Sequence, residues 1–304
     1  MKNLISSLYY KRYILYIIIG LVIAFIIAQK LINVNPRVDK NSEHYINSIY
    51  MSDGRIYESY LDENSQKLYI YLMENIKKRK KVIYIKPIDF GYNDYKEVYN
   101  VLSTVTHAIM IDHPELLSFG GWMAQYKAQK GEITFWIKNS FKLPFMDKIG
   151  EVLINKKIHD IQKETKNMTD KEKIKYVYNW IGKNTKYDKI FMYDSKNQTI
   201  YNVFVNHNAV CAGFAKASQV IFQALGIKSY IVLGNTTGAH MWNIVEVDGK
   251  NYYYDSTVAA CITEGHSAYY DGLKQSEFNN YKESYDWFPK VETTNLYEDY
   301  ELED

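Results

Sequence analysis

The dipeptide Asp248-Gly249 constrains the fold of this chain more than any other short feature of its sequence. Asp-Gly between two apolar, β-branched or aromatic runs is typical of a two-residue β-hairpin turn, whose twist matches that of its strands. With these residues at the turn, Val247 pairs with Lys250, and residues 240–247 run antiparallel to residues 250–257. A register shift of one residue would turn every side chain of one strand to the other face.

This register places two chemically active side chains on the same face of the hairpin. Asp255 lies opposite Trp242, and His240 lies two residues further along. Diagonal neighbours in an antiparallel pair are about 7–8 Å apart at the backbone, within reach of an imidazole and a carboxylate. We therefore expect Asp255 to orient His240.

A cysteine occupies the start of a predicted helix. Apolar residues recur at helical spacing from Phe214 to Leu225, and Gly226 ends the helix, so Cys211 lies at its first turn or just before it. Unpaired backbone N–H groups and the helix dipole favour an anion there, and therefore favour the thiolate. A free cysteine is also often a small buried core residue, so its position alone does not distinguish a nucleophile from packing.

Together the three residues have the chemistry of a thiol-based catalytic triad. Cys211 would be the nucleophile, and His240 would accept its proton and then donate one to the leaving amine. Asp255 would fix the tautomer of the imidazole and stabilise the imidazolium. The backbone N–H of Cys211 is the expected donor to the tetrahedral oxyanion, and Asn206 or Asn208 is a candidate side-chain donor.

The segments around these residues resemble the three motifs of bacterial transglutaminase-like domains. The motifs are Val-Cys-Ala-Gly-Phe-Ala at 210–215, His-Met-Trp-Asn-Ile-Val at 240–245 and Tyr-Tyr-Asp-Ser-Thr at 253–257, in the order Cys, His, Asp. The resemblance covers about residues 145–265. The sequence His-Pro-Glu-Leu-Leu at 113–117 resembles a segment from the N-terminal region of some secreted or anchored members.

The resemblance implies a papain-like α+β core, with the cysteine on a helix and the histidine and aspartate on adjacent antiparallel strands. It implies acyl transfer through a thioester, with Cys211, His240 and Asp255 as the residues that carry the reaction. The expected substrates are the amide bonds of proteins or peptides. Family members include cross-linkers and peptidases, so the resemblance does not separate transfer to an amine from hydrolysis.

Three other interpretations stay open at this point. His207 and Cys211 are four residues apart and His266 could join them at a metal, although no HExxH or Cys-x-x-Cys motif supports such a site. A disulfide between Cys211 and Cys261 would suit an extracytoplasmic domain and would remove the nucleophile. The chain could also be a non-catalytic surface binding or scaffold protein that retains the fold. The sequence predicts no cofactor.

An apolar segment near the N-terminus predicts a membrane anchor. Sixteen residues from Tyr13 to Ala28 carry no charge, and a snorkelling Lys30 extends the predicted single transmembrane helix to residues 13–30. Basic residues precede it, so we expect residues 1–12 in the cytoplasm and the remaining chain on the extracytoplasmic side of the cell membrane. A cleavable signal peptide is the alternative, although the segment ends with only one of the small residues that cleavage needs.

The rest of the chain divides into four predicted parts. Residues 31–55 are polar and predict a stalk, and residues 56–140 predict a small α+β domain. Residues 145–290 form the predicted transglutaminase-like domain, and residues 291–304 form an acidic, solvated tail. The fold class is therefore α+β, with two such domains behind one transmembrane helix.

The spacing of apolar residues and the turn signals predict the elements within these parts. A helix is expected from Ile56 to Ile76, and a strand from Lys81 to Lys86. A second helix should run from Asp94 to Ile111, followed by a hairpin that turns at Lys130-Gly131. Further on, a helix should start at a cap formed by Thr169.

The composition excludes several classes of protein. A chain of 304 residues with 47% hydrophobic residues can bury a sizeable core. Two cysteines are too few for a disulfide scaffold. The net charge of +2 arises from the N-terminus, because residues 1–30 carry four basic and no acidic residues, so the basic excess of a nucleic-acid binder is absent. The expected partners are the membrane, through residues 13–30, and protein or peptide substrates, with cell-wall peptides within reach of a wall-facing domain.

Overall fold

The computed structural model describes residues 56–117, 119–139, 145–190, 195–236, 238–262, 281–284 and 291. These residues all belong to one compact unit, Ile46–Asp304. The anchor predicted at residues 13–30 and the stalk predicted at residues 31–55 lie outside the described residues, as does the tail beyond residue 291. Within the described ranges, none of the helices combines the length and the apolar character that a membrane span requires.

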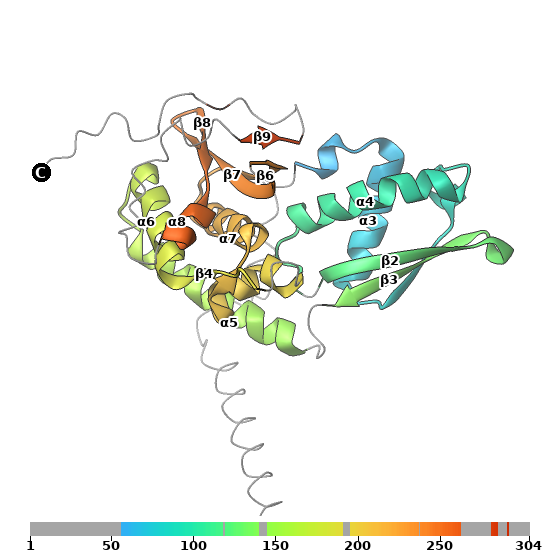
Figure 1. The fold of residues 1–304 in the computed structure, drawn as a ribbon, viewed down its shortest axis with the longest axis horizontal. Coiled ribbons are helices and arrows are strands. Elements are labelled where there is room, and N and C mark those ends of the chain that lie inside the picture. The colour runs from blue at the N-terminus through green and yellow to red at the C-terminus, as the bar shows by residue number, and fades with distance from the viewer. Residues whose placement is uncertain are drawn as a thin grey trace, which may run out of the picture. The chain divides into compact units, whose positions relative to one another are not determined.

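The N-terminal part of the described chain packs two helices against a three-stranded antiparallel sheet (Figure 1). The helices are α3 (Glu63–Lys77) and α4 (Tyr95–Asp112). The sheet has the order β1-β3-β2, and its strands are β1 (Val82–Ile85), β2 (Phe119–Lys127) and β3 (Glu132–Asn139). Short 3-10 helices lie at Glu58–Tyr60, Pro87–Phe90 and Ala128–Lys130.

The first predicted helix begins later than its apolar spacing indicates. Asp62 has an extended backbone, and its side chain accepts hydrogen bonds from the backbone N–H groups of Asn64 and Ser65, so α3 starts at Glu63. The prediction that the helix starts at Ile56 is therefore wrong. The 3-10 helix Glu58–Tyr60 precedes this cap as a separate element.

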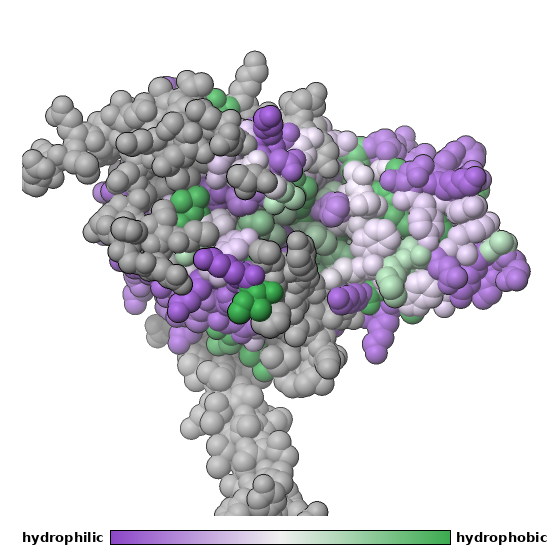
Figure 2. Space-filling model, viewed as in Figure 1, coloured by the Kyte–Doolittle hydropathy of each residue, from purple (hydrophilic) through white to green (hydrophobic). Residues whose placement is uncertain are grey.

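The other elements predicted in this part are confirmed with small changes at their ends. Helix α4 begins after Asp94, whose side chain caps it, and strand β1 lies within the predicted Lys81 to Lys86. Gly131 adopts φ 59° where β2 turns into β3, as a hairpin at Lys130-Gly131 requires. In the view of Figure 2, mainly hydrophilic residues cover the end of the molecule that carries this turn.

A buried polar cluster ties the beginning of the described chain to the end of α4. The carboxylate of Asp112 accepts hydrogen bonds from the backbone N–H groups of Tyr57 and Glu58 and from the hydroxyl of Tyr69. Burial is the main cause that raises the pKa of Asp112 to about 7. The His-Pro-Glu-Leu-Leu segment follows directly, and within it Nδ1 of His113 lies 2.6 Å from a carboxylate oxygen of Glu115.

The C-terminal part surrounds a central helix with other helices and a four-stranded antiparallel sheet (Figure 1). Its helices are α5 (Phe145–Glu164), α6 (Asp170–Asn184), α7 (Cys211–Ala224) and α8 (Ser256–Ile262). The sheet has the order β8-β7-β6-β9, with β6 (Ser229–Asn235), β7 (Ala239–Val247), β8 (Lys250–Tyr254) and β9 (Lys282–Glu283). The short strands β4 (Lys186–Tyr187) and β5 (Asn208–Ala209) pair in parallel, and 3-10 and π turns lie at Ser195–Gln198 and Asn202–Asn206. The α+β fold class is confirmed.

Helix α7 is the centre of this part. It contacts β6 and β7 on one side and α5, α6 and α8 on others, and its residues from Ala212 to Phe222 are all buried. Small side chains let its neighbours approach: a Cβ at Gly213 would lie 2.8 Å from the backbone oxygen of Asn197 and 3.0 Å from the Cβ of Ala209. Alanine is also the best helix former, so close packing and propensity agree here.

The two parts share one hydrophobic core. Ala212 and Ala215 on α7 belong to the same cluster of buried residues as Leu68 on α3 and Leu102 on α4. The hydroxyl of Tyr57 donates a hydrogen bond of 3.0 Å to the backbone oxygen of Ile231 on β6. The N-terminal part is thus packed against α7, which begins with Cys211, and against β6, the neighbour of the strand that carries His240.

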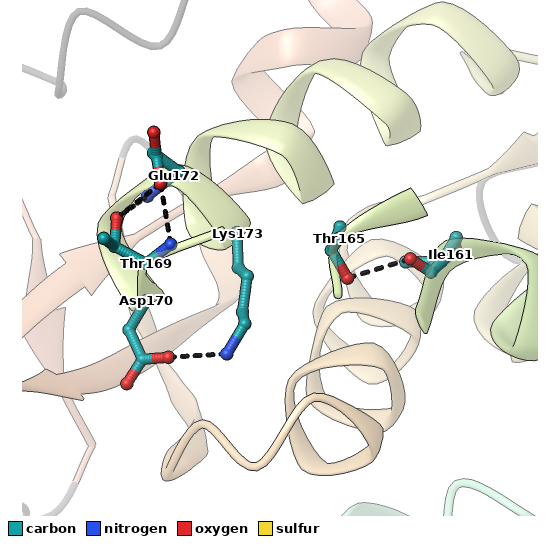
Figure 3. Close-up of polar contacts among 6 residues, drawn as sticks. All are labelled: Ile161, Thr165, Thr169, Asp170, Glu172 and Lys173. Carbon is teal, nitrogen blue, oxygen red and sulfur yellow. Dashed lines mark hydrogen bonds and ion pairs between the residues drawn. The ribbon is translucent and has the colours of Figure 1, made fainter. Parts of the chain in front are cut away.

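The start of α6 is a complete capping box, as its sequence predicts (Figure 3). The backbone N–H of Glu172 donates to the hydroxyl of Thr169 at 3.3 Å, and the carboxylate of Glu172 accepts from the backbone N–H of Thr169 at 2.7 Å. Both bonds satisfy donors that the first helical turn would otherwise leave unpaired.

Removing this cap should destabilise the protein measurably. We expect Thr169→Ala to lower the free energy of unfolding by about 1 kcal/mol, because it removes the acceptor of one helix N–H group. Glu172→Gln is the matched control, since glutamine can still accept from Thr169, and its loss should be smaller. Urea unfolding of both purified variants measures the difference. Equal losses for the two variants would contradict the role of Thr169.

Candidate active site

Cys211 is the first residue of α7, as the sequence predicts. The preceding residue, Val210, has an extended backbone, and its N–H donates to the backbone oxygen of Asn197 at 3.0 Å, which fixes where the helix begins. No side chain of the described chain caps this helix. The N–H of Gly213 donates to the backbone oxygen of Val210 at 2.8 Å, so the N–H groups of Cys211 and Ala212 are the candidates in the first turn to face an anion. Cys211 is a free cysteine with a half-buried side chain.

The hairpin of β7 and β8 has the predicted register. Val247 pairs with Lys250, and the pairing continues to Asn243 opposite Tyr254. Both turn residues have a positive φ, 53° at Asp248 and 75° at Gly249, as a type I′ turn requires.

Strand β8 is shorter than predicted. It ends at Tyr254 instead of continuing to Thr257, because α8 begins at Ser256. Asp255 stands between the strand and the helix, and one of its carboxylate oxygens accepts a hydrogen bond of 2.9 Å from the backbone N–H of Thr257. The prediction of a strand to residue 257 is therefore wrong, but the carboxylate still reaches the face that carries His240.

His240 and Asp255 form a close, buried pair. Nε2 of His240 lies 2.7 Å from Oδ2 of Asp255, and the side-chain exposures are 15% and 2%. Burial disfavours the carboxylate, but its hydrogen bonds, above all that with His240, lower the pKa of Asp255 below its ordinary value. The ionised carboxylate of Asp255 and the imidazolium of His240 therefore stabilise each other.

Asp255 and the thiol of Cys211 together determine the charge of the His240 imidazole. Burial alone would lower the pKa of His240, but the hydrogen bond with Asp255 and the interaction with Cys211 outweigh burial and raise it to about 10. Since Nε2 of His240 forms the hydrogen bond with Asp255, Nδ1 is the ring nitrogen that remains to interact with the thiol of Cys211. The arrangement can hold a positively charged imidazole between a carboxylate and a sulfur atom at neutral pH.

Aromatic rings enclose this imidazole. Trp242, two residues along β7, stacks on His240 with a centroid distance of 5.9 Å and an interplanar angle of 21°. The ring of Tyr281 meets His240 edge-on, also at 5.9 Å. The hydroxyl of Tyr281 donates a hydrogen bond of 2.7 Å to Oδ2 of Asp255. These contacts exclude water from two sides of the pair.

Two residues of this region are not predicted from the sequence. Tyr281 is far from Asp255 along the chain, and no local pattern marks it.

The second residue is Lys216, which is buried within α7. Burial lowers its pKa to about 8 against the opposing effect of Cys211. Burial and Lys216 together lower the pKa of His107 on α4. The sequence signal for Lys216 is its position as a single lysine among the small, apolar residues that follow Cys211.

The candidate side-chain donors for the oxyanion are engaged in other hydrogen bonds. The amide of Asn206 donates to the side-chain oxygen of Asn202 at 2.8 Å. The amide of Asn208 donates to the carboxylate of Asp188 at 2.6 Å, and the amide of Asn197 donates to the same oxygen at 2.7 Å. This network holds the loop before α7 in place.

The alternative sites can also be placed. His207 is exposed, with a φ of 58°. Among the residues described, no group of three or more His, Cys, Asp or Glu side chains is arranged to hold a metal ion. His266 lies outside the described residues, as does the side chain of Cys261.

Comparison with known proteins supports the resemblance for the C-terminal part. Residues 159–255 match the family described as the Transglutaminase-like superfamily, so this stretch is a transglutaminase-like domain. It contains Cys211, His240 and Asp255. No match was found among curated proteins.

Solved structures of several proteins are similar to parts of this chain. A candidate cysteine protease from Cytophaga hutchinsonii has 15% sequence identity and a TM-score of 0.31, with 45% of this chain and 61% of that chain covered. A TGase has 19% identity and a TM-score of 0.35, with 57% and 54% covered. A candidate protease from Parabacteroides distasonis has 17% identity and a TM-score of 0.29, with 45% and 36% covered. The chain thus spans about a third to three fifths of the length of these proteins.

Removing the charge of Asp255 should lower the pKa of His240. We expect the imidazole of the wild-type protein to titrate near pH 10, and that of Asp255→Asn to titrate well below this, because the anion that favours the imidazolium is lost. NMR of protein labelled at histidine, followed against pH, measures both values.

Asp188→Asn provides the matched control for this titration. Asp188 is also a buried aspartate, but its carboxylate bonds to asparagine amides and the backbone N–H of Ile190. This variant should leave the pKa of His240 unchanged. The same value in wild type and Asp255→Asn would show that the pair does not set the charge of the imidazole.

Proposed function

We propose that this protein is a cysteine acyl-transfer enzyme of the transglutaminase-like type, acting on amide bonds of proteins or peptides. The observation that carries the proposal is the hydrogen bond of 2.7 Å between His240 and Asp255, with Cys211 at a helix start close enough to act on the same imidazole. In this proposal Cys211 is the nucleophile, His240 the base and Asp255 the orienting carboxylate, and they come from three separate segments of the sequence.

The first half of the proposed reaction forms a thioester. The proton of Cys211 rests on His240, and the thiolate attacks the carbonyl carbon of the substrate amide. The tetrahedral oxyanion accepts a hydrogen bond from the backbone N–H of Cys211, the first residue of α7. The C–N bond then breaks, and His240 donates its proton to the leaving amine, which departs as a neutral product.

The second half returns the enzyme to its starting state. Water or a second amine attacks the thioester carbon, and the neutral imidazole of His240 takes the proton of the attacking group. The C–S bond breaks and the thiolate of Cys211 leaves, so the thiolate and the imidazolium are restored. Water gives hydrolysis and an amine gives cross-linking, and the same three residues serve both reactions.

The proposal is tested by the two cysteines of the chain. Cys211→Ala should abolish turnover with little change in stability, because it removes one half-buried sulfur atom. Cys261→Ala is the matched control and should keep its turnover. Mass spectrometry of surface-protein mixtures incubated with the purified protein detects new chain ends or new isopeptide links.

The rate of thiol alkylation gives a second measurement that needs no substrate. Iodoacetamide should label Cys211 faster than Cys261, and His240→Ala should slow the labelling of Cys211, because the thiolate loses its counter-ion. An active Cys211→Ala variant, or a Cys211 that labels no faster than Cys261, would favour a non-catalytic binding protein or scaffold.

We also propose that residues 13–30 anchor this enzyme in the cell membrane, with residues 1–12 in the cytoplasm and the catalytic residues outside. The support is the uncharged segment Tyr13–Ala28 behind a basic flank. Cell-wall peptides would then be substrates within reach of the domain.

Protease added to intact protoplasts should digest the domain, because it would lie outside the membrane. A cytoplasmic marker protein serves as the control for lysis and should survive. Protection of the domain until the cells are lysed would overturn this topology.

A further inference from the structure

We infer that Tyr281 is a positioning residue of the candidate site, because the C-terminal strap, residues 281–284, places its hydroxyl on the carboxylate that orients His240. The inference rests on the proposed function and extends it. It makes the catalytic arrangement depend on a segment that lies outside the matched stretch, residues 159–255.

The C-terminal strap is held on the sheet by its backbone. It adds β9 to the free edge of β6, and Figure 1 shows the two strands beside each other. The register pairs Gly234 with Glu283 and Asn235 with Lys282, and the N–H of Ser284 donates to the oxygen of Leu233 at 2.8 Å. The approach is close, because a Cβ at Gly234 would lie 2.2 Å from the backbone oxygen of Lys282 and 2.4 Å from the ring of Trp242.

The side chain of Tyr281 completes the surroundings of the buried pair. Its hydroxyl lies 2.7 Å from Oδ2 of Asp255, the same oxygen that Nε2 of His240 approaches to 2.7 Å. Its ring meets Trp242 edge-on at a centroid distance of 5.0 Å. The ring of Tyr281 therefore contacts both the imidazole of His240 and the ring of Trp242.

A second contact anchors the strap and does not involve the carboxylate of Asp255. The hydroxyl of Tyr253 on β8 donates to the carboxylate of Glu283, two residues after Tyr281 in the strap. The two tyrosines thus differ in what they bind. Tyr253 holds the strap to the hairpin, whereas Tyr281 acts on Asp255.

The hydroxyl of Tyr281 has a specific effect on the buried carboxylate. Asp255 is 1% exposed, and a buried carboxylate is stable only when donors replace water. The groups that face it are His240 on β7 with Cys211 beyond it on α7, the backbone N–H of Thr257 on α8, and Tyr281. The hydroxyl also fixes where Oδ2 points, and therefore how the imidazole is turned toward the thiol.

The experiment compares Tyr281→Phe with Tyr253→Phe in the full chain. Tyr281→Phe should lower kcat about tenfold with KM unchanged, which is the rate equivalent of one hydrogen bond to a charged group. The acidic limb of its kcat/KM profile should move to higher pH, because Asp255 loses a donor that favours its charged form. Tyr253→Phe should leave the acidic limb where it is in the wild type, because the backbone pairing of β9 with β6 still holds the strap and Tyr281 in place.

A spectroscopic measurement separates this inference from the proposed function. The downfield proton resonance of the bond between His240 and Asp255 should shift in Tyr281→Phe and stay unchanged in Tyr253→Phe, and it requires no turnover. If the wild-type protein has no turnover, the proposed function fails and this resonance still decides the role of Tyr281. A resonance and a pH profile like those of the wild type in Tyr281→Phe, or equal changes in both variants, would overturn the inference.

Discussion

The two residues at the turn between β7 and β8 determine how the candidate site is assembled. Asp248 and Gly249 both have positive φ, so the hairpin can close with two residues and in one register. That register brings Asp255 to the face of the sheet where His240 lies. A shift by one residue would send the carboxylate to the opposite face, and the imidazole would be buried without an acceptor. The chemistry proposed here therefore depends on a backbone conformation at a turn that takes no part in it.

Local signals in the sequence predicted the elements and the first three residues of the site. The Asp-Gly turn, the helix start at Cys211 and the capping box of Thr169 are each specified within a few residues, and the structure has all three. Asp62 is also a local signal, but a longer apolar spacing obscured it and moved the predicted helix start to Ile56.

Features that depend on distant segments could not be predicted in this way. The end of β8 at Tyr254 depends on the buried position of Asp255 beside α8. The contact of Tyr281 with Asp255 depends on which edge of the sheet the later chain joins, and a strand of two residues, Lys282–Glu283, leaves no periodic pattern. The burial of Lys216 likewise depends on α4 and on the parts packed around α7, which its own sequence does not specify.

The edge strand β9 also links the candidate site to the tendency of the sheet to aggregate. It covers the edge of β6 through two strand residues and the hydrogen bond from the N–H of Ser284 to the oxygen of Leu233. A molecule in which residues 281–284 detach has Asp255 without the hydroxyl of Tyr281, and the edge of β6 is unpaired. Such an edge can accept a strand from another chain. One local opening would therefore both expose an edge that can aggregate and remove a hydrogen bond from the surroundings of the imidazole.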